Sequence, residues 1–197
     1  MTKVLSKKNS SPPSINRRHL LSYLLIFIIS PCLTFVLGLW LDEKFLLPKF
    51  PPIPVNFLLG SIVLFTGLAI GIHSTRILYK FGKGLPWGEF AEETRTSKLT
   101  ITGAYSYCRN PMTIGYSMLP CGMGIMFRSL TMTLLIPSIS LAVSIIWIKL
   151  REEPNLVKRF GDSYKEYKKK TPFLIPMPKF VIYYLVNLKK ILLEKGD

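Results

Sequence analysis

The fold is decided by residues 109–154, which read RNPMTIGYSMLPCGMGIMFRSLTMTLLIPSISLAVSIIWIKLREEP. Two apolar runs lie in this stretch, Pro111 to about Phe127 and Leu130–Leu150, and only two residues separate them. Helices joined by so short a turn pack as an antiparallel hairpin. The polar residues 109–110 ahead of the first run and 152–153 behind the second are therefore expected at the same end of the hairpin.

Two further apolar runs precede the hairpin, Leu20–Leu41 and Val55 to about Ile72. Of the 197 residues, 49% are hydrophobic, yet the formal net charge is +15. This composition excludes a disordered chain, a collagen and a disulfide scaffold. We predict an all-α integral membrane protein with about four transmembrane helices, an antiparallel C-terminal helix hairpin and cytosolic interfacial helices. Small residues in the second of these runs favour close approach of a neighbouring helix, namely Gly60, Gly67, Ala69 and Gly71.

The distribution of positive charge orients these helices. Of the 26 Lys and Arg residues, 23 lie in three segments that four spans would place on one side of the membrane. Positive residues concentrate on the cytosolic side, so both termini, the loop from Arg76 to Asn110 and the C-terminal region are predicted to be cytosolic. The basic residues flank spans and form no patch on a soluble fold, which argues against nucleic-acid binding.

The sequence after the fourth apolar run predicts helices that lie at the membrane interface. Pro154 either kinks the fourth helix or lies in the first turn of a new one. Residues 180–193 are too short an apolar stretch to span a bilayer and are expected to lie on the membrane. Between them, an amphipathic helix is predicted from apolar residues that recur every three or four positions, at Leu156, Val157, Phe160, Tyr164 and Tyr167.

Arg109, Asn110 and Pro111 open the third helix and are candidate ligand-binding residues. Proline suits the first helical turn, where an N–H group would have no partner in the helix. The free N–H groups and the positive end of the helix dipole favour an anionic group there. In a purely structural alternative, Arg109 reaches lipid headgroups and Asn110 caps the helix.

Glu152 and Glu153 close the fourth helix on the same side as Arg109. A carboxylate pair at this position can bind an ammonium group or ribose hydroxyls, or can act as an acid or base with a raised pKa. In the alternative interpretation, the pair stabilises the N-terminus of a helix that begins near Pro154, with Arg151 as its partner.

Other polar residues give weaker signals. The three cysteines and two histidines do not cluster in the sequence, so neither a disulfide framework nor a metal site is expected. His73 is expected to be a hydrogen-bonded interfacial residue. The stretch Gly82-Lys83-Gly84 would let the backbone approach a ligand closely, but it lacks the spacing of a phosphate loop.

Several short motifs between Gly82 and Pro176 share an order and a spacing. They are Gly82-Lys83-Gly84-Leu85-Pro86, the segment Lys98-Leu99-Thr100 through Gly103 and Tyr105, Arg109-Asn110-Pro111-Met112-Thr113 through Gly115, and Glu152-Glu153-Pro154-Asn155-Leu156 followed by Arg159-Phe160-Gly161, Tyr164, Tyr167, Pro172 and Pro176. On these motifs the chain resembles the isoprenylcysteine carboxyl methyltransferase and phospholipid methyltransferase family of integral-membrane enzymes.

The resemblance implies transfer of a methyl group from the cofactor S-adenosylmethionine to a lipophilic acceptor, such as a prenylcysteine-like carboxylate, at the cytosolic membrane surface. It implies cofactor-binding roles for Lys98, Leu99, Thr100, Tyr105, Asn110, Pro111, Met112, Thr113 and Glu152. It implies catalytic roles for Arg109, Glu152 and Glu153. The chain departs from the family at Asn110, where a His is common, and at Thr113, where a Tyr is frequent.

With this resemblance, the chain divides into four parts. Residues 1–19 form a basic cytosolic tail and residues 20–75 a transmembrane helix pair. Residues 76–178 form the cofactor-binding and catalytic region, and residues 179–197 the C-terminal interfacial helix. Two other functions fit part of the pattern: a sterol-reductase-like enzyme that uses NADPH, and a non-catalytic membrane protein that binds lipid or a partner chain.

Overall fold

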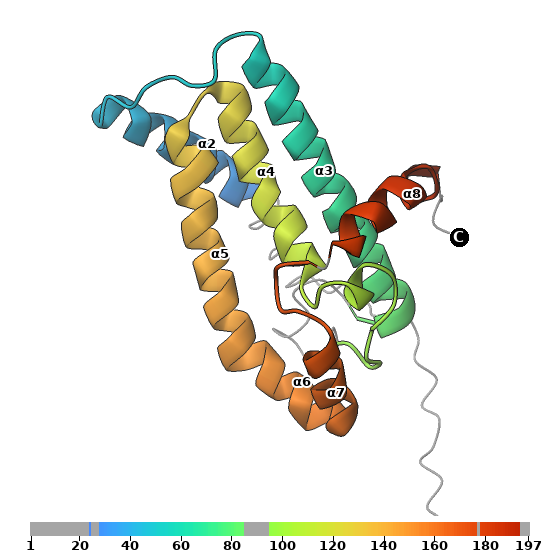
Figure 1. Ribbon diagram of the computed structural model, residues 1–197. Helices are drawn as coiled ribbons and strands as arrows, with labels where there is room; N and C mark the ends of the chain where they lie inside the picture. Colours follow the sequence, from blue (N-terminus) through green and yellow to red (C-terminus); the bar gives the residue numbers. More distant parts are fainter. Residues whose placement is uncertain (1–23, 25–27, 85–94, 177, 194–197) are drawn as a thin grey trace, which may run out of the picture.

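The computed structural model describes residue 24 and residues 28–84, 95–176 and 178–193, and all regular structure in these residues is helical (Figure 1). The all-α prediction is confirmed. The α-helices are α2 (Ser30–Lys44), α3 (Val55–Ile77), α4 (Pro111–Phe127), α5 (Ile136–Trp147), α6 (Glu153–Phe160), α7 (Asp162–Lys170) and α8 (Lys179–Leu193). Short π-helical turns are η2 (Leu78–Gly82), η6 (Thr131–Leu135) and η7 (Ile148–Glu152), and η5 (Gly103–Ser106) is a 3₁₀ turn. The predicted tail 1–19 and two residues of the glycine motif, Leu85 and Pro86, lie outside the described residues.

Among the described residues, two continuous helices are long and apolar enough to cross a membrane. Val55–Gly82 has 28 residues and a mean hydropathy of 2.1, and Thr131–Phe160 has 30 residues and a mean hydropathy of 2.0. Only 28% and 17% of their apolar windows are buried inside the protein, so the rest of this surface calls for an apolar surrounding. α4 has 17 residues, and positions 20–23 and 25–27 of the predicted first run lie outside the described part of the chain.

α3 and α4 pack along their length through glycines, as expected for a close helix pair in a membrane (Figure 1). A Cβ atom added to Gly115 would lie 2.6 Å from the backbone nitrogen of Gly71 and 2.9 Å from the carbonyl oxygen of Gly67. One added to Gly60 would lie 2.8 Å from the carbonyl oxygen of Gly122. The predicted close approach is confirmed at these three glycines of α3.

The last long helix, Thr131–Phe160, continues past Pro154. The chain was expected to leave the fourth helix near Leu150, but it stays helical to Phe160, with the π turn η7 leading into α6. Pro154 lies in the first turn of α6, as one alternative predicted, but α6 continues the Thr131–Phe160 helix and is not a separate helix. A proline ring clashes with the carbonyl four residues before it, and the wider π turn relieves such crowding.

The predicted amphipathic helix after Pro154 is in fact two helices. Gly161 has φ 55° and ψ −129°, and it separates α6 from α7. The periodic pattern missed this break because Tyr164 and Tyr167 still face the protein interior on the far side of the glycine, at 3% and 9% exposure.

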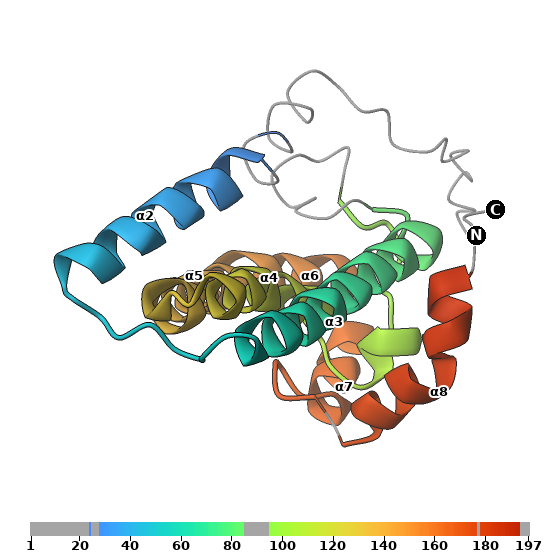
Figure 2. The ribbon, with the colours of Figure 1, turned by 90° about the horizontal axis from the view of Figure 1, so that it is seen from above.

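α4 and α5 run in opposite directions after the turn at Arg128, and α2 lies to one side of the α3–α5 group (Figure 2). A carboxylate oxygen of Asp42, in α2, accepts hydrogen bonds from the backbone N–H of Thr131 at 2.9 Å and from its hydroxyl at 2.6 Å. This contact satisfies a free N–H at the start of the long Thr131–Phe160 helix.

α8 packs on the C-terminal part of α3 through aromatic side chains. Phe180 is 4% exposed, and the Tyr183 hydroxyl lies 2.8 Å from Nε2 of His73. His73 is thus hydrogen-bonded, as predicted. The opposite face of α8 exposes Val181, Ile182, Leu185 and Val186.

Candidate active site

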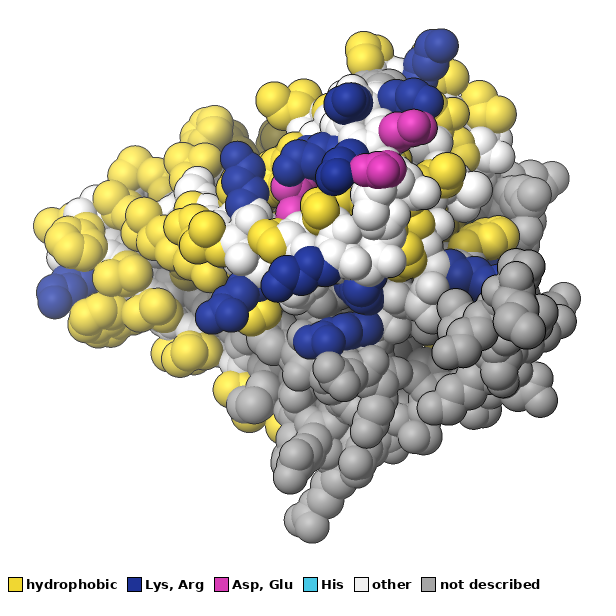
Figure 3. Space-filling model, turned by 90° about the horizontal axis from the view of Figure 1, so that it is seen from below, with side chains coloured by type: hydrophobic (Ala, Val, Ile, Leu, Met, Phe, Trp, Pro, Cys, Tyr) yellow, Lys and Arg dark blue, Asp and Glu magenta, His cyan; other side chains and the backbone are white. Residues whose placement is uncertain are grey.

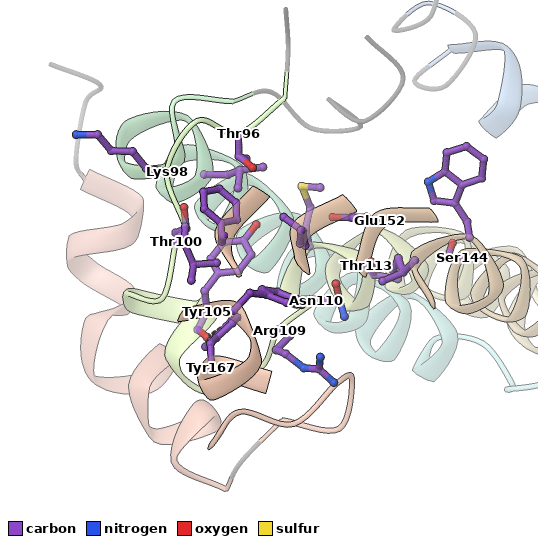
Figure 4. A pocket seen from close by; sticks show the side chains of 18 of the residues that line it. Thr96, Lys98, Thr100, Tyr105, Arg109, Asn110, Thr113, Ser144, Glu152 and Tyr167 are labelled. Carbon is purple, nitrogen blue, oxygen red and sulfur yellow. Dashed lines mark hydrogen bonds between the residues drawn. The ribbon is translucent and has the colours of Figure 1, made fainter. Parts of the chain in front are cut away.

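A cavity of about 300 Å³ lies where the start of α4 meets the end of the α5 helix (Figure 4). α6, α7, Leu78 and residues 96–105 supply its remaining walls. Its lining residues are Leu78, Thr96, Lys98, Leu99, Thr100, Tyr105, Arg109, Asn110, Met112, Thr113, Tyr116, Val143, Ser144, Trp147, Ile148, Glu152, Leu156, Phe160, Tyr164 and Tyr167.

Most of the residues singled out from the sequence line this one cavity. They are Lys98, Leu99, Thr100, Tyr105, Arg109, Asn110, Met112, Thr113 and Glu152. The turn that opens α4 and the acidic pair after α5 therefore meet. Pro111 and Glu153 do not line the cavity. Pro111 is buried at the start of α4, and Glu153 is separated from the cavity by Arg109, with which it forms an ion pair. The Lys98 ammonium points away from the other labelled side chains, so its stem is what the cavity touches (Figure 4).

The sequence did not single out the α5 and α4 residues deeper in the cavity. Tyr116 lies one helical turn beyond Met112, and Ile148 and Ser144 lie one and two turns before Glu152. Helical spacing from the predicted residues would have found them. Tyr164 and Tyr167 were predicted as an apolar face only, yet both line the cavity.

Asn110 occupies the N-cap position of α4, but its side chain does not cap the helix. Its amide nitrogen Nδ2 instead donates to the carbonyl oxygen of Phe173 at 2.9 Å. The alternative in which the Asn110 side chain caps the third helix is therefore wrong. The bond joins the turn to residues 171–176, which connect α7 to α8.

The same connection holds two more residues of the turn. The backbone N–H of Arg109 donates to the carbonyl of Pro172 at 3.0 Å, and the Cys108 thiol donates to the carbonyl of Leu174 at 3.2 Å. On the other side, the Tyr167 hydroxyl donates to the carbonyl of Tyr105 at 2.6 Å. Residues 105–110 are thus fixed from both α7 and the segment that follows it.

Arg109 is a buried cation and does not reach out to headgroups. Its side chain is 9% exposed, and its Nη1 atom donates to Oε1 of Glu153, whose side chain is 8% exposed. Lys168 donates to the other oxygen, Oε2, at 2.6 Å. The guanidinium also lies 5.4 Å from the ring centroid of Phe173. Glu153 is in the first turn of α6, as the structural alternative required, but its ion-pair partners are Arg109 and Lys168 and not Arg151.

Two polar atoms of the cavity residues are buried without a hydrogen-bond partner in the described part of the chain, Oγ1 of Thr100 and Nε of Arg109. A buried polar group without a partner is costly, which marks both as atoms suited to meet a ligand. The position of Thr100 also explains why residue 82 is a glycine, because a Cβ atom there would lie 2.7 Å from Oγ1 of Thr100. The carbonyl of Gly82 accepts the N–H groups of Ser97 and Lys98 at 2.9 and 3.1 Å.

Burial keeps three of the cavity tyrosines neutral, Tyr105, Tyr164 and Tyr167. Burial, and then the nearby charge of Glu152, hold the pKa of Tyr105 well above its ordinary value. Burial likewise raises the pKa of Tyr164 and Tyr167, and it raises the pKa of the Cys108 thiol to about 11. None of these four groups is therefore ionised at neutral pH, and the charged cavity residues near the turn are Arg109 and Glu152.

The family described as phospholipid methyltransferase matches residues 55–163, which is more than half of the chain and includes every predicted site residue. A protein-S-isoprenylcysteine O-methyltransferase of Schizosaccharomyces pombe is 28% identical over 133 residues, covering 66% of this chain and 56% of that protein. The chain thus spans little more than half the length of this relative. No solved structure matches the chain significantly. The resemblance seen in the sequence motifs is confirmed, and the chain belongs to the phospholipid methyltransferase family.

Proposed function

We propose that the protein is an integral-membrane methyltransferase that moves a methyl group from S-adenosylmethionine to a lipophilic acceptor. The observation that carries the proposal is the cavity itself. Its polar end holds Thr100, Asn110 and Glu152, and its other end continues along α5 to Ser144 and to Val143, which is 61% exposed. A polar donor and an apolar acceptor can meet in such a space.

The residues at the polar end fit the donor. Glu152 is an acceptor for hydroxyl or ammonium hydrogens, and Oγ1 of Thr100 is a buried polar atom without a partner among the described residues. Leu99, Met112 and Tyr105 offer apolar surface to a ring or a thioether. We assign binding of the cofactor to the predicted set Lys98, Leu99, Thr100, Tyr105, Asn110, Met112, Thr113 and Glu152, with Pro111 shaping the turn. The cofactor, when bound, supplies an electrophilic methyl group on a sulfonium.

The chain's own part in the reaction is orientation and exclusion of water. Methyl transfer by in-line displacement depends on the alignment of donor and acceptor more than on a strong base. Asn110 carries no titratable group, and neither Tyr105 nor Tyr164 ionises near neutral pH. Leu156 and Phe160 close the cavity on the α6 side.

Arg109 is the candidate to orient the acceptor. It lines the cavity, and its Nε–H has no partner within the described segments, so it can bind a carboxylate or another anionic group. Arg151, the other cation considered, is exposed and does not line the cavity. Thr113 gives a shorter wall than the Tyr frequent in the family, which leaves more room for the acceptor.

The predicted membrane arrangement, four spans with both termini and the cavity on the cytosolic side, is part of this proposal. Figure 3 views the α6–α7 end of the molecule, where Lys and Arg side chains gather beside apolar ones. Basic residues at this end and apolar helices beyond it agree with a cytosolic membrane surface.

The test is transfer of label. Membranes containing the protein are incubated with S-adenosylmethionine labelled in its methyl group and are then extracted into lipid, small-molecule and protein fractions. The proposal expects protein-dependent label in one fraction, and an acceptor with an apolar chain. Thermal stabilisation by NADPH together with no labelled product would favour the sterol-reductase-like alternative.

A further inference from the structure

Glu153 is shared by two cations on opposite sides. Its Oε1 accepts from Arg109, which faces the cavity, and its Oε2 accepts from Lys168 at 2.6 Å, whose side chain is 47% exposed. Lys168 itself does not line the cavity. A surface lysine is thereby joined to a cavity residue through one buried carboxylate.

The charges of this group decide what the cavity attracts. Arg109 and Glu153 alone would sum to zero, and a neutral pair holds an incoming anion weakly. With Lys168 bound to the same carboxylate, the three residues Arg109, Glu153 and Lys168 carry a net positive charge, which offsets the negative charge of Glu152 in the same cavity.

The two oxygens of Glu153 are divided between the two cations. Oε1 accepts from Nη1 of Arg109, and Oε2 accepts from Lys168. Nε of Arg109 stays without a partner within the described residues, and the ring of Phe173, 5.4 Å from the guanidinium carbon, supports the side chain.

We propose that Lys168 is a positioning residue that acts through Glu153 and Arg109 to give the acceptor end of the cavity its affinity for a negatively charged group. This inference rests on the proposed function in that the anion belongs to the methyl acceptor. The acceptor class is then an apolar chain that ends in a carboxylate or another anion.

Two neighbouring lysines provide the contrast. Lys165 pairs with Asp162 at 2.8 Å, and Lys170 lies 4.0 Å from Glu166, and in both pairs the two side chains are at least 59% exposed. Such exposed pairs are screened by solvent, and none of the four residues lines the cavity. Lys165 is therefore a matched control on the same helix.

The experiment uses the full chain, purified in detergent, and two probes, N-acetyl-S-farnesylcysteine and its methyl ester. The ester lacks the negative charge of the acid and carries one additional methyl group. The variants are Lys168→Met, Lys168→Gln, Lys168→Arg and Lys165→Met, and the readout is the ratio of the two dissociation constants, which a fraction of inactive protein does not change. Binding of S-adenosylhomocysteine is measured in parallel.

The wild type is expected to bind the acid at least about fivefold more tightly than the ester. Lys168→Met and Lys168→Gln should lose most of that preference, whereas Lys168→Arg and Lys165→Met should keep it to within about twofold. A purely structural role for Lys168 would weaken acid and ester alike. The inference is overturned by no acid preference in the wild type, or by an unchanged ratio in Lys168→Met or Lys168→Gln. If the wild type prefers the acid but does not bind S-adenosylhomocysteine, the result would instead contradict the proposed methyl donor.

Discussion

Arg109 and Glu153, 44 residues apart in the sequence, form an ion pair in which both side chains are at least nine-tenths buried. The pair joins the turn that opens α4 to the first turn of α6. Beside it, Asn110 and Glu152 face the same cavity. This contact gives the cavity its position at one end of the α4–α5 pair, and it makes the cavity dependent on long-range packing.

The first prediction concerns the stability of that pair. Glu153→Ala leaves the Arg109 guanidinium buried without its carboxylate, and we expect a loss of about 3–5 kcal/mol in unfolding free energy, as for other broken buried pairs. Glu166→Ala removes only an exposed carboxylate and should cost less than about 1 kcal/mol. Thermal unfolding in detergent compares the two. Equal melting temperatures would show that the buried pair does not stabilise the fold.

The second prediction concerns the α3–α4 contact. Gly115→Val would push a side chain against the backbone of Gly71, since even a Cβ atom would lie 2.6 Å from its nitrogen. We expect a loss of several kcal/mol, roughly 3 or more, because neither backbone can move without separating the helices. At Gly161, where nothing lies within 4 Å of an added Cβ, alanine should cost only about 1–3 kcal/mol for the backbone conformation with φ 55° and ψ −129°. The reverse order of the two losses would be incompatible with the glycine packing described above.

The third prediction concerns pH. Burial raises the pKa of the Cys108 thiol from 9.0 to about 11. The folded state keeps the thiol proton to a higher pH than the unfolded state does. The contribution of the protonated thiol to the unfolding free energy is therefore fully present below about pH 8.5 and is lost as the pH rises through 11. The unfolding free energy of the wild type should therefore fall between about pH 9 and 11, by up to about 2 kcal/mol more than that of Cys108→Ala. Parallel pH profiles for the two proteins would contradict the burial of this thiol.

The sequence predicted the features that depend on run length and on proline. α4 occupies Pro111–Phe127 as expected, because an apolar run that begins at a proline marks a helix start well. The two-residue turn after it then brings Glu152 back toward Asn110. The extension of α3 and η2 to Gly82 was not predicted, because polar residues such as Thr75 and Arg76 continue the helix beyond the apolar run.

The contacts that hold the cavity together leave no pattern in the sequence. Phe173 binds Asn110 through its backbone carbonyl and Arg109 through its ring, and only the ring depends on residue type. Lys168 is one of three consecutive lysines, and nothing in their sequence distinguishes the one that reaches Glu153. The ion pairs that join Glu153 to Arg109 and Lys168 therefore become visible only in the folded structure.

The measurement that tests the central claim most directly is calorimetric binding of S-adenosylhomocysteine to the wild type, Glu152→Ala and Glu166→Ala in detergent. Glu152 lines the cavity with Asn110 and Thr100, whereas Glu166 is an exposed residue of α7. We predict that the wild type and Glu166→Ala bind alike, and that Glu152→Ala binds at least about tenfold more weakly, the effect of losing a hydrogen bond to a charged group. Equal affinity of Glu152→Ala and the wild type, or no binding by the wild type, would contradict a cofactor chamber between the α4 turn and Glu152.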